Sequence, residues 1–229
     1  MGKALTEHLA SAGWSVIIHF NSSEKEALEL ALLLKQKYPK QNFDTIKANL
    51  SEIDKVKDLI SRVVVKYGQF ELLVNNASVF DPGYISETTL ELYDLQMNVN
   101  LKAPLFLIRD FAKSCKEGNI INFVDTRITT NKSNFAAYSI SKKALWELTK
   151  MAALEFAPKI RVNAIAPGVT LPPEGQDDTY LQKLAGNIPM KKPGGLIPIL
   201  RSLDYILQNE HLTGQLLFAD GGENLGQNV

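Results

Sequence analysis

The chain has 229 residues, of which 45% are hydrophobic and 22% charged, values that fit one globular domain over residues 1–229. Its 25 basic and 25 acidic side chains balance, which disfavours nucleic acid or an anionic membrane surface as the main partner. The only cysteine, Cys115, cannot form an internal disulfide or a cysteine-rich metal site, so we expect a reducing cytoplasm and no metal. The N-terminal pattern is that of an amphipathic helix rather than a signal peptide, and no apolar run approaches the roughly 20 residues of a membrane span.

Helical stretches alternate with short apolar runs along the chain. In chain order the sequence predicts helix 2–12, strand 15–20, helix 24–37, strand 43–48, helix 52–66, strand 71–75, helix 90–115, strand 119–124, helix 136–156, strand 160–165, a loose segment 169–176, a short helix near 178–185 and strand 215–219. This alternation is typical of right-handed βαβ units around a parallel sheet. Because the strands are apolar almost throughout, helices should cover both faces. We therefore predict an α/β fold, with a Rossmann-like doubly wound parallel sheet in a three-layer sandwich.

The first residues depart from that plan. A nucleotide-binding fold opens with a strand and a glycine-rich turn, and the pyrophosphate then binds at the N-terminus of the following helix. Here Met1-Gly2-Lys3 leads directly into a helix, so the first strand and most of the turn are missing from the sequence. We interpret Gly2 as the last glycine of that turn, and the alternative is an ordinary second residue.

Two motifs are candidates for chemistry. The small and amide side chains of Asn75-Asn76-Ala77-Ser78, after a predicted strand, would let the backbone approach a ligand, although taken alone a plain turn explains them better. Tyr138 and Lys142 are four residues apart and share one face of a predicted helix. A neighbouring ammonium lowers the pKa of a tyrosine, which would make Tyr138 a proton donor or acceptor near neutral pH. An exposed pair without a role is the alternative.

In their order along the chain, these residues resemble the short-chain dehydrogenase/reductase family. The resemblance rests on residues 75–78, on Asn100, on the Tyr138 and Lys142 pair, and on Arg161-Val162-Asn163, Pro167-Gly168, Thr213-Gly214-Gln215 and Asp220-Gly221-Gly222. It implies hydride transfer between a nicotinamide cofactor and a small molecule, with Tyr138 exchanging the proton. It further implies that Lys142 binds the nicotinamide ribose, that Asn100 holds a water of the proton relay, and that the chain forms a homotetramer through helices 90–115 and 136–156.

One departure from the family's usual pattern is informative. The family usually has a serine at the end of the strand before the catalytic helix, whereas this chain has Asp125. The aspartate is similar to that of the pteridine reductase branch, including bacterial dihydromonapterin reductases, and Phe80 resembles the phenylalanine that stacks on the pterin there. A carboxyl group can pass a proton to a ring nitrogen, and an aromatic face suits a flat ring. The expected substrate residues are Ser78, Phe80, Asp125 and Tyr138. A turn or cap role for Asp125 and core packing for Phe80 are the alternatives.

The cofactor is expected to be NADPH. Asn21, Ser22 and Ser23 follow the first predicted strand without an acid before Glu24, and hydroxyl and amide groups there accommodate a 2′-phosphate. A neutral loop with little selectivity is the alternative. The expected cofactor-binding residues are Gly2, Asn21, Ser22, Ser23, Asn49 and Leu50 (beside the adenine), Asn76, Ala77, Ser78, Tyr138, Lys142, Pro167 and Gly168.

The sequence therefore favours an NADPH-dependent reductase that converts a dihydropterin to a tetrahydropterin. Two other functions stay open. One is a general carbonyl or 3-oxoacyl reductase in which Asp125 merely replaces the usual serine. The other, because the first strand is missing, is a truncated module that does not catalyse.

Overall fold

Six strands and nine α-helices alternate in the computed structural model, which describes residues 1–172, 175 and 177–226. The strands are β1 (Val16–Phe20), β2 (Phe43–Lys47), β3 (Leu72–Asn75), β4 (Gly118–Phe123), β5 (Ile160–Pro167) and β6 (Leu216–Ala219). The helices are α1 (Gly2–Ser11), α2 (Glu24–Lys37), α3 (Ile53–Val56), α4 (Leu59–Tyr67), α5 (Leu90–Met97), α6 (Ala103–Ser114), α7 (Ala136–Phe156), α8 (Asp178–Ala185) and α9 (Ile197–Gln208). No helix of the described part is long and apolar enough to cross a membrane.

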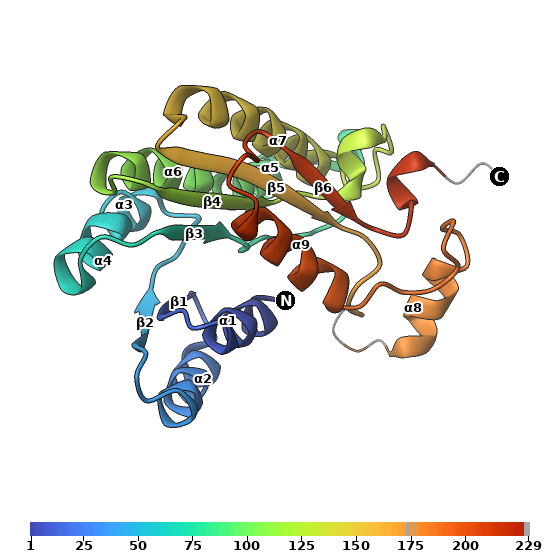
Figure 1. The fold of residues 1–229 in the computed structure, drawn as a ribbon. Coiled ribbons are helices and arrows are strands. Elements are labelled where there is room, and N and C mark those ends of the chain that lie inside the picture. Colours follow the sequence, from blue (N-terminus) through green and yellow to red (C-terminus); the bar gives the residue numbers. More distant parts are fainter. Residues whose placement is uncertain (173–174, 176, 227–229) are drawn as a thin grey trace.

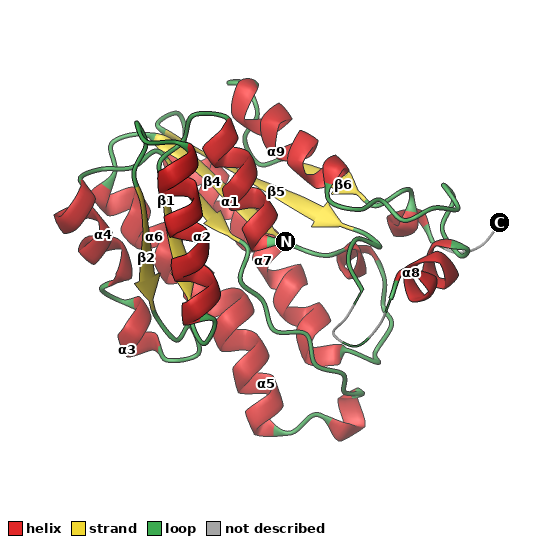
Figure 2. Cartoon of the chain, turned by 90° about the horizontal axis from the view of Figure 1, so that it is seen from below, coloured by secondary structure: helices red, strands yellow, loops and turns green. Residues whose placement is uncertain are grey.

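All strand pairs are parallel, as predicted. β1 pairs with β2, and β3, β4, β5 and β6 pair in that order. Figures 1 and 2 show helices on both sides of the strands, with α5, α6 and α7 on one side and α1 and α9 on the other. The predicted α/β fold with a parallel, doubly covered sheet is therefore confirmed.

Successive residues of β4 explain why two layers of helices are needed. Ile120 packs against α6 and α7 through Phe111 and Ala152, whereas Ile121, on the opposite face, packs against Leu203 of α9. Both isoleucines are fully buried, because side chains alternate between the faces of a strand and both faces are covered. Burying such a side chain contributes roughly 1.5–3 kcal/mol, so the β4 core is a main source of stability.

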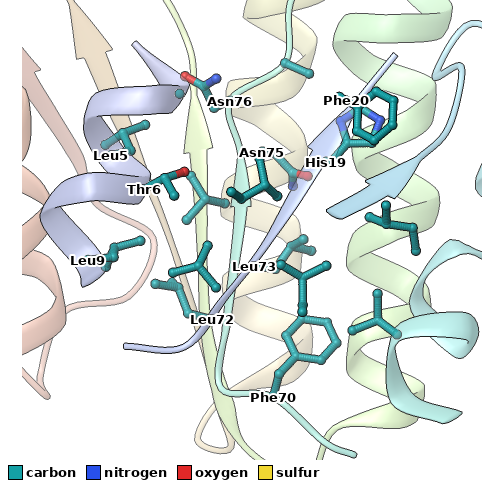
Figure 3. Close-up of a pocket in the computed structure, with 18 of the residues that line it drawn as sticks. Leu5, Thr6, Leu9, His19, Phe20, Phe70, Leu72, Leu73, Asn75 and Asn76 are labelled. Carbon is teal, nitrogen blue, oxygen red and sulfur yellow. The ribbon is translucent and has the colours of Figure 1, made fainter. Parts of the chain in front are cut away.

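The sheet is split between β1 and β3. Within the described residues no strand lies between these two, and a cavity of about 730 Å³ occupies the space. Figure 3 shows side chains that line it from α1, β1 and β3, among them Leu5, Leu9, Phe20 and Leu73. The split lies where a strand preceding α1 would run.

Two helical predictions need correction, and one helix was missed. The predicted helix 90–115 is α5 and α6 joined by a π-helical turn, η2 (Asn98–Lys102), and the predicted helix 52–66 is interrupted between α3 and α4. Helix α9 was not predicted at all. Its N-terminal residues Ile197 and Pro198 follow a Pro- and Gly-rich stretch, which obscures the helical pattern of the buried Ile199, Leu203 and Ile206.

Candidate active site

The carboxyl ends of two neighbouring strands, together with helix α7, bring the candidate catalytic residues together. β3 ends at Asn75, which is in register with Asn122 of β4, and β4 leads into Asp125. The side chains of Asn75, Asn122 and Thr149 of α7 form a buried chain, with 2.8 Å from Asn75 Nδ2 to Asn122 Oδ1 and 2.9 Å from Asn122 Nδ2 to Thr149 Oγ1. Because buried amides must be paired, this chain fixes α7 against the strand ends.

Asp125 and Tyr138 form a hydrogen-bonded dyad. The Tyr138 hydroxyl donates to Asp125 Oδ2 at 2.7 Å, and Asp125 Oδ1 accepts from the backbone N–H of Arg127 at 2.8 Å. The second bond caps the short helix η3 (Thr126–Thr129), so the turn and cap role is real and coexists with the contact to Tyr138. The predicted catalytic pair of carboxyl and phenol is thus placed together by η3 and α7.

Lys142 lies close to the dyad of Asp125 and Tyr138. The residue is only 2% exposed, and its ammonium donates to the Phe123 carbonyl at 2.8 Å and lies 5.8 Å from the centre of the Tyr138 ring. Burial lowers the pKa of Lys142 to about 8. The remaining N–H donors of Lys142 have no partner among the described residues, which fits the predicted bonds to a ribose hydroxyl.

The predicted lowering of the tyrosine pKa is wrong. Burial raises the pKa of Tyr138, and the negative charge and hydrogen bond of Asp125 raise it further, while Arg127 opposes them. The Lys142 ammonium donates its hydrogen bond to a backbone carbonyl instead of to the phenol, so its charge does not determine the direction of the Tyr138 pKa shift. Tyr138 therefore keeps its proton at neutral pH, as a proton donor requires.

Asn100 is fully buried in the π-helical turn η2, and its Oδ1 accepts from the Ser78 hydroxyl and from the Val79 N–H, both at 3.0 Å. Its Nδ2 donates to the Val79 carbonyl at 3.0 Å and to Ser141 Oγ at 3.2 Å. The Asn100 side chain thus positions the Ser78 turn against α7, and a part for Asn100 in a proton relay through water stays a prediction.

Aromatic rings stand beside the dyad. Phe80 lies edge-on to Tyr138 with 4.6 Å between ring centres, and it stacks on Phe135 at 4.1 Å with the rings nearly parallel. Phe80 is 51% exposed, so it is a wall of the site and the core-packing alternative does not hold. The structure thus brings together Ser78, Phe80, Asp125 and Tyr138, the four residues predicted to meet the substrate.

Two groups of predicted cofactor residues can be placed here: those that line the cavity between β1 and β3, and those in the loops that follow β1 and β2. Five of them line the cavity of Figure 3 and its rim, namely Gly2, Ser23, Leu50, Asn76 and Ala77. Asn21 and Ser22 are exposed after β1, and the neighbouring Glu24 is paired with Lys47 at 3.3 Å. Asn49 is bonded to Glu52 and Ser51, so its amide is already occupied.

Two close approaches fit a cofactor cleft. A Cβ on Gly2 would lie 3.1 Å from Asn76 Nδ2, and a Cβ on Gly168 would lie 2.6 Å from the Asp220 Cα, so glycine is required at the second position. Gly168 follows Pro167, the last residue of β5, and so lies at the carboxyl ends of the strands, as the dyad does. The first turn of α1 has no side-chain cap and no acidic residue, which leaves its N–H groups open to a phosphate.

Sequence reasoning missed Phe135 and Arg127. Phe135 reaches Phe80 because a backbone bridge joins Gly83 to Phe135, with Gly83 N donating to the Asn134 carbonyl at 3.0 Å. The Arg127 guanidinium lies 4.6 Å above the Phe135 ring. The only sequence signals were an arginine two residues after Asp125 and an aromatic residue three before Tyr138. No cluster of metal-ligating side chains is found in the described part of the chain.

The comparisons with known proteins agree on the family. A family model described as short chain dehydrogenase matches residues 1–180. The chain is 27% identical to a glucose 1-dehydrogenase of Gluconobacter oxydans, covering 98% of this chain and 88% of that protein. It is also 27% identical to a 3-oxoacyl-acyl-carrier-protein reductase, FabG, of Staphylococcus epidermidis, covering 97% of this chain and 93% of the relative.

Some similar solved structures have a higher identity. The FolM alternative dihydrofolate reductase 1 of Brucella canis, solved in complex with NADP, is 34% identical, with a TM-score of 0.91 over 100% of this chain and 91% of that one. A short chain dehydrogenase of Burkholderia cenocepacia, also in complex with NADP, is 25% identical, with a TM-score of 0.88 over 97% of this chain and 93% of that one. The chain therefore belongs to the short-chain dehydrogenase family of oxidoreductases.

Proposed function

We propose that the chain is an NADPH-dependent reductase of a dihydropterin. The observation that carries the proposal is the 2.7 Å hydrogen bond from the Tyr138 hydroxyl to Asp125, beside the exposed ring of Phe80. A carboxyl in this place, where the family usually has a serine, suits a ring with amino and amide donors, and Phe80 suits a flat ring. The 34% identity to a dihydrofolate reductase of the same fold supports the same substrate class.

The protein's own residues would divide the work. NADPH, when bound, supplies the hydride, and the residues that would hold it are Lys142, Gly168 and the polar segment after β1. Tyr138 keeps its proton at neutral pH and would donate it to a ring nitrogen of the substrate, with Asp125 orienting the hydroxyl. The negative charge left on the phenol oxygen would be offset by the Lys142 ammonium, 5.8 Å from the ring centre, and not by the Asp125 carboxylate. Tyr138 is buried, which limits the access of water to its hydroxyl.

The second candidate function is reduction of a simple carbonyl or a 3-oxoacyl thioester. The relatives named as 3-oxoacyl reductases favour it. In that case Asp125 has no partner on the substrate and serves only to orient Tyr138.

A replacement at Asp125 separates the two functions. NADPH consumption is measured with 7,8-dihydrobiopterin, dihydromonapterin and a 3-oxoacyl thioester, for the wild type, Asp125→Ser, Asp125→Ala and Tyr138→Phe. The pterin function predicts turnover of the dihydropterins, lost in Tyr138→Phe and reduced by roughly 100-fold or more in both Asp125 variants. Thioester turnover that survives or increases in Asp125→Ser, without dihydropterin turnover by the wild type, would establish the carbonyl function instead. If the wild type does not bind NADPH, the remaining explanation is the truncated module that does not catalyse.

We also propose a homotetramer. Large apolar side chains are exposed on α5, α6 and α7, the helices that were expected to form the interface: Leu95, Leu105, Ile140, Met151 and Leu154. Exposed apolar patches of this kind mark protein interfaces.

A further inference from the structure

The wall of the site carries a fixed positive charge that the proposed reaction does not use. Arg127 follows the catalytic Asp125 by two residues in η3, and its backbone N–H is already bound to the Asp125 carboxylate. Its guanidinium lies 4.6 Å over the Phe135 ring and 5.8 Å from the centre of the Phe80 ring. Nη1 donates to Asn134 Oδ1 at 3.0 Å.

All of these partners are neutral. Within the described residues no carboxylate comes within ion-pairing distance of the Arg127 guanidinium, although arginine is the cation best suited to bind a carboxylate through two parallel hydrogen bonds. The stacking on Phe135 and the bond to Asn134 hold the planar group in one orientation. A preoriented cation loses little entropy when an anion binds.

An acidic side chain, Glu223, lies in the short helix η4 (Glu223–Leu225), which packs on η3. Burial and the charges of Asp125 and Asp220 raise the pKa of Glu223, whereas the charges of Arg127 and Lys132 oppose this rise without an ion pair being formed. The Thr129 hydroxyl donates to the Asn224 carbonyl at 3.0 Å and joins the two helices. The site therefore has a carboxyl side that suits amino and amide donors, and an aromatic side that ends in a guanidinium.

We propose that Arg127 selects substrates whose ring system carries a negatively charged carboxylate tail. This inference rests on the proposed function. The pterin ring would lie at Asp125 and Tyr138 with Phe80 beside it, an aryl spacer would pass along Phe135, and the carboxylates would bind the guanidinium. Arg127 is thus a specificity residue for the tail. It does not strengthen the binding of a reduced pterin whose side chain is neutral.

The test compares two dihydropterins that differ in their tails. Steady-state KM and kcat are measured at low ionic strength with 7,8-dihydrofolate, which has an anionic tail, and with 7,8-dihydrobiopterin, which has a neutral one. The variants are Arg127→Gln and Arg127→Lys, with Lys132→Gln, an exposed neighbouring cation, as the matched control. The thermal melting temperature of each variant shows that the fold is kept.

Arg127→Gln is expected to raise the KM for dihydrofolate about ten-fold or more and to leave the KM for dihydrobiopterin as it is. Any change in kcat that arises through the pKa of Tyr138 should be the same for both substrates. Arg127→Lys should recover part of the loss, since it keeps the charge but not the planar fork. Salt should weaken dihydrofolate binding by the wild type more than by Arg127→Gln. An equal effect of Arg127→Gln on both substrates, or the same effect in Lys132→Gln, overturns this inference alone. Failure of the wild type to turn over either dihydropterin overturns the proposed function and this inference with it.

Discussion

The Lys142 ammonium donates a 2.8 Å hydrogen bond to the Phe123 carbonyl, the last of β4, from a position that solvent scarcely reaches. Burial lowers its pKa to about 8, from an ordinary value of 10.5. Below pH 8 both the folded and the unfolded chain carry the charge, and the folded state bears the full desolvation cost. Between pH 8 and 10.5 the unfolded chain binds more protons, so the stability of the fold rises with pH.

The wild type should therefore gain stability relative to Lys142→Met as the pH increases. From pH 7.5 to 9.5 the expected relative gain is roughly 2 kcal/mol. Urea unfolding of both proteins across this range measures it. The raised pKa values of Cys115 and Tyr138 act in the opposite direction at high pH, but they are common to both proteins and cancel in the difference. A difference that stays constant with pH would show that Lys142 titrates normally.

The buried chain from Asn75 through Asn122 to Thr149 predicts strongly coupled mutations. Thr149→Val leaves Asn122 Nδ2 without an acceptor in a fully buried place, which should cost about 1–3 kcal/mol. In the background of Asn122→Leu the stranded donor no longer exists, so the same change should cost much less. Ser202→Ala is the control, because Ser202 also bonds to the carbonyl four residues before it but supports no second side chain. Additive effects of the two substitutions, measured by chemical denaturation, would contradict the coupling.

The order and type of most elements could be predicted from the sequence, because fully buried parallel strands are continuous apolar runs that helices separate. The π-helical turn at Asn98–Lys102 could not, since its cause is tertiary: Asn100 is held by Ser78, Val79 and Ser141. A helical period in the sequence carries no information about such a contact.

The site could be predicted only in part, because its local contacts follow from the sequence and its contacts between distant segments do not. Tyr138 and Lys142 are neighbours on one helix, so their proximity is local. The pairing of Phe80 with Phe135 depends on a bridge between distant segments, and the raised pKa of Tyr138 depends on burial and on Asp125. Spacing along the helix indicated the lysine as the main influence on the tyrosine, whereas the fold directs that ammonium to a backbone carbonyl.

The apolar side chains on α7 predict how the proposed tetramer can be dissociated. Met151 is 66% exposed and Leu154 is 85% exposed, although both are large and apolar. The double variant Met151→Lys/Leu154→Lys should shift the mass measured by light scattering to that of a smaller species, because burying two charges in an apolar contact is costly. Leu33→Lys, at a 52% exposed position on α2, is the control that should leave the mass unchanged. A wild type that is monomeric at micromolar concentration would refute the tetramer.

The cavity between β1 and β3 predicts that an engineered strand will stabilise the chain. The two flanking strands present backbone N–H and C=O groups toward the gap, and the lining of the cavity includes Leu5, Leu9, Ile18 and Leu73. Gly2 lies against Asn76, just beyond the carboxyl end of β3, so a strand that enters α1 through a short turn would run parallel to β1 and β3. Such a strand would pair on both sides and bury apolar residues on both faces, as a central strand of a parallel sheet does.

The test is an N-terminal extension of about six Val and Ile residues, joined to Gly2 by a short glycine-containing turn, a length that spans roughly 20 Å. Filling the cavity and pairing both edges should raise the melting temperature by several degrees. A Gly/Ser extension of equal length is the control, because it can bridge the same distance but buries no apolar surface. Hydrogen exchange should slow at the amides of β1 and β3 in the apolar extension only. Equal melting temperatures for the two extensions would mean that the gap does not admit a strand, and that the flanking edges close on each other instead.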